Sequence, residues 1–100
     1  MSYDPGALHA ALAAAVGEDS ALIADLRTAF MDSAARQIDL LGRARCDANW
    51  QLAAWRLKGL AASFGLTALM ALAEDAAQAA PGDPAVLRQL RTALAALEQE

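Results

Sequence analysis

The chain has 100 residues, of which 57% are hydrophobic and only 5% aromatic, and its formal net charge at pH 7 is −4. This length suffices for one small core, so we expect a single domain spanning residues 1–100. The chain has no cluster of five or more Lys and Arg residues, which argues against nucleic acid or an anionic membrane as a partner. The apolar content is mainly Ala and Leu, both strong helix formers, and this predicts an all-α fold.

The single cysteine, Cys46, excludes an internal disulfide and fits a reducing compartment. The first residues contain no basic region of the kind that opens a secretory signal. The longest uncharged run, between Lys58 and Glu74, is shorter than the roughly 18 residues that a membrane span requires. Cys46 and the lone histidine, His9, match no metal-ligand spacing. We therefore expect a cytoplasmic protein with no cofactor and no metal site.

Two helices are predicted in the first half of the chain. Asp4-Pro5 fits an N-cap followed by proline at the first helical position, which predicts a short helix to about Val16. A second, longer helix is expected to begin at an Asp19 or Ser20 cap and to fray near residues 42–47. Its apolar positions are three and four residues apart, as on the buried face of a helix: Ile23, Leu26, Phe30, Ala34, Ile38 and Leu41.

Three helices are predicted in the second half. Asp47 is expected to cap the third helix, which Gly65 ends, and the fourth is expected over residues 66–80. A turn at Pro81-Gly82 leads to a second cap-plus-proline start at Asp83-Pro84. Four long helices joined by short loops predict an antiparallel up-and-down four-helix bundle, with the short N-terminal helix closing one end.

Trp55 falls on the outer side of the third helix when residues are spaced at about 100° each. With Leu57 at the centre of the buried face, the apolar residues within about 60° of it are Trp50, Ala53, Ala54, Leu60, Ala61 and Phe64. Trp55 lies roughly 160° away from Leu57. Its neighbours are small or polar: Gly59, Ala62, Lys58 and Gln51. Either the short N-terminal helix covers Trp55, or Trp55 belongs to a docking patch, where tryptophan is a favoured anchor.

The stretch Ala54-Trp55-Arg56-Leu57-Lys58-Gly59, followed by Gly65, resembles the central motif of histidine-containing phosphotransfer (HPt) domains. That motif is Ala-His-x-Leu-Lys-Gly, with a second glycine six residues on. Every fixed position is present except one, because tryptophan stands where the family carries its phospho-accepting histidine. The resemblance extends to Asp4-Pro5-x-x-Leu8, to Val16-Gly17-Glu18-Asp19 and to the helix around Phe30. The chain is thus identified as a degenerate member of the family.

The resemblance implies a bundle whose histidine projects into solvent and takes a phosphoryl group from the aspartate of a receiver domain. Lys58 matches a lysine that attracts the phosphoryl oxygens, Gly59 matches a glycine that lets the receiver approach, and Ser63 occupies the place of a small polar residue at the edge of the site. The indole nitrogen of Trp55 is a hydrogen-bond donor only. It cannot act as the nucleophile that phosphoryl acceptance requires.

We therefore expect a signalling domain, not an enzyme, that docks on receiver or histidine-kinase domains without transferring phosphate. The resemblance and the helical wheel give its expected contact surface as Gln51, Trp55, Arg56, Lys58, Gly59, Ala62 and Ser63. Arg56 and Lys58 could equally be ordinary solvated charges, which is also what we expect of Glu74-Asp75. Two alternative functions stay open. One is a phosphotransfer protein that uses His9 as its acceptor, and the other is a helical homodimer outside signalling that buries Trp55 against a second copy.

Overall fold

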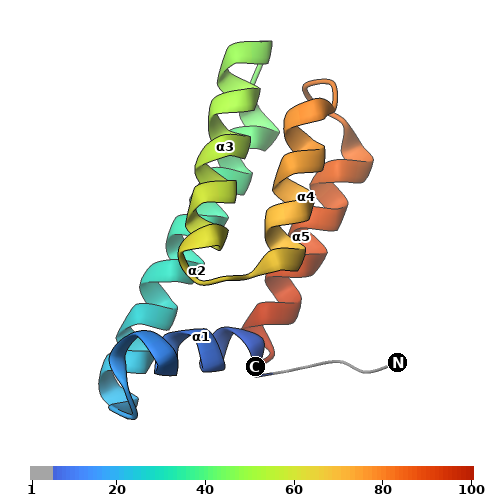
Figure 1. Ribbon diagram of the computed structural model, residues 1–100. Helices are drawn as coiled ribbons and strands as arrows, with labels where there is room; N and C mark the ends of the chain where they lie inside the picture. Colours follow the sequence, from blue (N-terminus) through green and yellow to red (C-terminus); the bar gives the residue numbers. More distant parts are fainter. Residues whose placement is uncertain (1–5) are drawn as a thin grey trace.

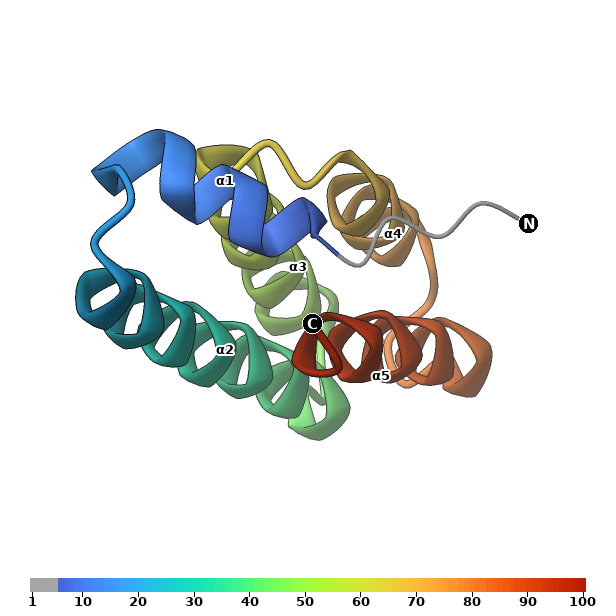
Figure 2. The ribbon, with the colours of Figure 1, turned by 90° about the horizontal axis from the view of Figure 1, so that it is seen from below.

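The computed structural model describes residues 6–100, in which all the regular structure is helical (Figure 1). The helices are α1 (Ala7–Val16), α2 (Ser20–Arg43), α3 (Asp47–Ser63), α4 (Thr67–Gln78) and α5 (Pro84–Glu98). Helices α2 to α5 run alternately up and down, and α1 lies across one end of them (Figures 1 and 2). The predicted all-α bundle with an additional N-terminal helix is confirmed. The predicted helix start at Asp4-Pro5 lies outside the described residues.

Each of the helices α2 to α5 packs against two others of these four, so they form a ring in which α3 lies between α2 and α4. The predicted inner face of α3 is buried at Trp50, Ala53, Ala54, Leu57 and Ala61 and partly buried at Leu60 and Phe64. Phe64 meets Phe30 of α2 edge to face, with 5.4 Å between the ring centroids. Within the described part of the chain, no helix combines the length and apolar character needed to cross a membrane.

Two of the three predicted caps on described residues form as expected. The Asp19 carboxylate accepts a hydrogen bond from Leu22 N at 3.1 Å, and the Asp83 carboxylate accepts from the N–H groups of Ala85 and Val86. The predicted Asp47 cap is wrong. Cys46 occupies the N-cap of α3 without a side-chain hydrogen bond, and Asp47 is the first helical residue. In the first turn, the negative charge of Asp47 still interacts favourably with the positive end of the helix dipole.

Asp83→Ala is expected to lower the free energy of unfolding by about 1 kcal/mol, because two N–H groups of the first turn of α5 lose their acceptor. Urea unfolding followed by circular dichroism measures this difference. Asp83→Asn is the matched control, since the amide oxygen can still accept and should recover most of the loss. An alanine variant as stable as the wild type would contradict a stabilising cap.

Gly65 ends α3 as predicted. Its φ of 64° suits glycine, and a Schellman-type pair of hydrogen bonds forms, from Gly65 N to Ala62 O and from Leu66 N to Ala61 O. α4 ends at Gln78, two residues before the predicted limit. The connections from α3 to α4 and from α4 to α5 are short, and they fix the order in which the helices surround the core.

α1 is fastened to the end of the bundle by contacts that span almost the whole chain. Leu8 and Leu12 are fully buried, and Glu100 Oε1 accepts hydrogen bonds from Leu8 N at 2.9 Å and from His9 N at 3.2 Å. Glu100 thereby satisfies two N–H groups in the first turn of α1. Because α1 is held across the end, it does not lie along the outer side of α3 (Figure 2).

Candidate functional site

Trp55 lies at the midpoint of α3, and 48% of its surface is exposed. The alternative in which the N-terminal helix covers it is therefore wrong. Large aromatic side chains contribute most to stability when they are buried, so an indole left half exposed gains little from the fold. The exposed face around Trp55 is the first feature of the candidate site.

Lys58 lies on the side of Trp55 that faces α4. Its Nζ is 4.9 Å from the centroid of the Trp55 ring and 3.4 Å from Glu74 Oε2. The expectation that Glu74 is simply solvated needs correction, since this exposed carboxylate pairs with Lys58 across two helices. Each contact contributes little to stability at such exposure, about 0.5–1 kcal/mol or less. Together the two contacts hold the Lys58 ammonium beside the indole, and the Glu74 carboxylate offsets the positive charge of that ammonium.

The other residues of the predicted surface are exposed, namely Gln51, Arg56, Gly59, Ala62 and Ser63. Ser63 Oγ donates a hydrogen bond to Gly59 O at 3.0 Å, so the hydroxyl hydrogen is used within the helix. A Cβ added at Gly59 would meet nothing within 4 Å. Packing inside the chain therefore does not require glycine here, although glycine in a helix costs roughly 0.5–1 kcal/mol relative to alanine.

His9 lies apart from this group. It is exposed on α1, and its backbone N–H is bonded to Glu100 at the closed end of the bundle. The contacts around Trp55 are made by residues of α3 and α4, namely Trp55, Lys58 and Glu74. His9 takes no part in these contacts.

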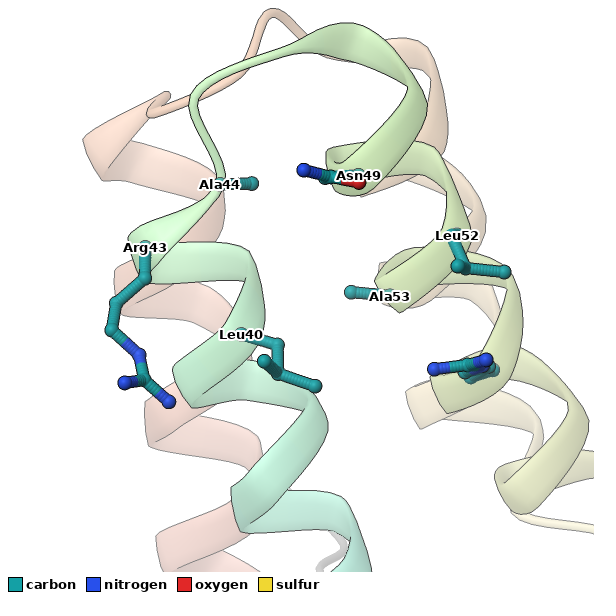
Figure 3. Close-up of a pocket in the computed structure, with 7 residues that line it drawn as sticks. Leu40, Arg43, Ala44, Asn49, Leu52 and Ala53 are labelled. Atoms are coloured by element: carbon teal, nitrogen blue, oxygen red, sulfur yellow. The ribbon is translucent and has the colours of Figure 1, made fainter.

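A groove of about 430 Å³ lies between α2 and α3, on the side of Trp55 opposite α4. Its lining residues are Leu40, Arg43, Ala44, Asn49, Leu52, Ala53 and Arg56. Figure 3 shows Leu40 of α2, and Ala44 just after the end of α2, facing Ala53 and Asn49 of α3. This groove was not predicted from the sequence. The available signal was Leu52, a large apolar residue that lies about 60° from Trp55 on the helical wheel, outside the buried stripe.

The comparisons with known proteins identify the family. The family model described as Hpt domain matches residues 25–100, which extend from within α2 to the end of the chain. Neither a search of curated proteins nor a search of solved structures gives a match. Hpt domains act in phosphorelay signalling, as phosphotransfer carriers rather than catalysts, and interact with receiver and kinase domains. Because the matched region covers three quarters of the chain and the fold is the helical bundle that the motif predicts, this chain belongs to the Hpt domain family.

Proposed function

We propose that this chain is a phosphorelay docking domain, which binds receiver or histidine-kinase domains through the face around Trp55 and does not carry phosphate. The observation that carries the proposal is the half-exposed Trp55 at the midpoint of α3, within an otherwise well-packed Hpt bundle. In a cell such a domain would act as a competitor or scaffold, because it occupies a partner's phosphotransfer surface without advancing the relay.

The side chains support binding better than transfer. Phosphoryl acceptance needs a nitrogen lone pair, and the indole of Trp55 offers only an N–H donor. Lys58, whose ammonium lies over the indole ring, is already paired with Glu74. The surface therefore lacks the reactive atom of a carrier site, and part of its positive charge is already paired.

The same face suits association with a flat protein surface. Trp55 supplies a large anchor, and the neighbouring Gly59 and Ala62 are exposed and carry almost no side chain. A partner can therefore approach the backbone of α3 closely while covering the indole. Burial of exposed tryptophan at the centre of an interface is among the most favourable single contributions to binding.

The test is a binding titration against the receiver and histidine-kinase domains of the same cell. Trp55→Ala is expected to cost at least about 2 kcal/mol, or roughly 30-fold in affinity, with any partner that the wild type binds. Leu22→Ala is a matched control. Leu22 is also a large exposed apolar residue, but it lies near the start of α2, on a different helix from Trp55. Absence of measurable binding to any of these domains would exclude the proposal.

Transfer is tested with the same partners. Labelled phospho-receivers are expected to retain their phosphoryl group when mixed with the wild-type chain. Label appearing on the chain would overturn the non-transferring function, and loss of that label in His9→Ala would then identify His9 as the acceptor.

A further inference from the structure

We propose that the groove between α2 and α3 binds an amphipathic helix of a partner protein, with an apolar stripe flanked by carboxylates. The proposal rests on the proposed function only for the class of protein that carries this helix. The shape and charge of the groove come from its own residues, so its binding chemistry can be tested without any signalling partner.

The groove is apolar where a helix would lie. Leu40 and Leu52 line it and are 38% and 49% exposed, and Ala44 and Ala53 add small side chains between α2 and α3. Leu40, Leu52 and Trp55 are three of the four large hydrophobic residues that are exposed in the described part of the chain. Clustered exposure of this kind marks an interaction surface, whereas scattered single residues do not.

The groove continues the Trp55 face. Leu52 precedes Trp55 by three residues and Arg56 by four, so the three side chains are neighbours on the surface of α3. The lining residues of α3 run from Asn49 to Arg56, which spans about 10 Å along the helix axis. That length matches two turns of a bound helix, enough for apolar anchors at positions i, i+3 or i+4, and i+7.

The charge of the groove selects an acidic partner. Arg43 and Arg56 line it, and none of its lining residues is acidic. Among the residues that the structure describes, Arg56 forms no ion pair and Arg43 pairs only with Asp39, in an exposed contact that a partner carboxylate can replace.

On the other side of Trp55 the corresponding positive charge is already compensated, because Lys58 pairs with Glu74. The uncompensated cation therefore lies on the groove side. The chain as a whole carries a formal charge of −4. The groove is therefore positive on a chain whose net charge is negative, and this difference orients an acidic helix toward α2 and away from α4.

A display selection tests this directly. A library of helix-forming peptides with randomised apolar and flanking positions is selected for binding to the full chain. We expect enriched peptides to have an apolar i, i+3 or i+4, i+7 stripe with Asp or Glu beside it. Binding of these peptides should fall roughly tenfold in Leu52→Ala, while Leu22→Ala leaves it unchanged. Their affinity should also fall with added salt.

Charge reversal gives the second arm. In the double variant Arg43→Glu and Arg56→Glu, the same selection is expected to enrich Lys and Arg at the flanking positions. Both substitutions are at exposed positions, and circular dichroism confirms that each variant is folded.

Each of the following results of the selection would overturn the proposal: no enriched peptide, peptides whose binding is unaffected by Leu52→Ala, or the same flanking charges with both proteins. Sedimentation that shows self-association abolished by Leu52→Ala would also overturn it, because a second copy would then occupy the groove. Receiver and kinase titrations separate the two proposals. Peptide binding without receiver or kinase binding would exclude the proposed function but support helix binding in the groove. Receiver or kinase binding without peptide binding would exclude only helix binding in the groove.

Discussion

Trp55→His is expected to convert the chain from a protein with no phosphoryl acceptance into an acceptor. The substitution places an imidazole at the exposed midpoint of α3, next to Lys58 and the open surface at Gly59. The neutral imidazole supplies the lone pair that indole lacks. Removing the indole also takes away its contact with the ammonium of Lys58, which then has, among the residues that the structure describes, only Glu74 as a competing partner when phosphoryl oxygens approach.

Phosphoramidate is a suitable donor for this experiment because it needs no receiver. The imidazole nitrogen attacks phosphorus, the P–N bond of the donor breaks, and ammonia leaves with the proton that the imidazole loses. Intact mass spectrometry is expected to show one added phosphoryl group on Trp55→His and none on Trp55→Ala. The double variant Trp55→His and His9→Ala should keep the label, which places it at position 55.

Glu74 is expected to limit this restored activity. Its carboxylate lies 3.4 Å from Lys58 Nζ, where it competes with the phosphoryl group for the ammonium and repels the incoming negative charge. Adding Glu74→Gln to Trp55→His should therefore raise the rate of phosphorylation, with Asp75→Gln as the neighbouring control. A folded Trp55→His that stays unlabelled in both backgrounds would show that more than the acceptor atom separates this site from a carrier.

The fold was predictable because its signals are local. Asp19 and Asp83 each cap the helix that follows, Gly65 adopts the positive φ that ends α3, and the apolar spacing of α3 gives its buried face. The exposure of Trp55 follows from the same spacing, since a residue opposite the buried stripe reaches solvent unless another element covers it. These features depend on neighbours within one or two helical turns.

The contacts that sequence reasoning missed join distant segments. Glu74 meets Lys58 because α4 packs beside α3, and Leu40 lines the same groove as Leu52 because α2 packs on the other flank of α3. Neither the helical period nor a motif specifies which side of α3 faces which neighbour. The bonds from α1 to Glu100 are likewise set by the closure of the bundle. Yet these contacts decide which charges on the site remain free.

The two tryptophans of α3 are expected to differ sharply in their effect on stability. Trp50 is fully buried, and its Nε1 donates to Ala76 O of α4 at 2.6 Å. Trp50→Ala should lower the free energy of unfolding by about 3–5 kcal/mol, since it leaves a large cavity. That is a large share of the 5–15 kcal/mol typical of such domains. Trp55→Ala should change it by no more than about 1 kcal/mol, since the substitution removes only the contact with Lys58 and partly buried surface.

Urea unfolding followed by far-UV circular dichroism measures both differences, and two conservative variants guard against a failure to fold. Trp50→Phe keeps most of the packing but loses the hydrogen bond to Ala76, so its cost should be smaller, about 1–2 kcal/mol. Its tryptophan fluorescence, excited at wavelengths that tyrosine does not absorb, comes from Trp55 alone and should peak at long wavelength, whereas Trp55→Phe leaves only buried Trp50 and should emit further to the blue. A large stability loss in Trp55→Ala would mean that Trp55 is retained for packing, and the docking function would lose the physical argument on which it rests.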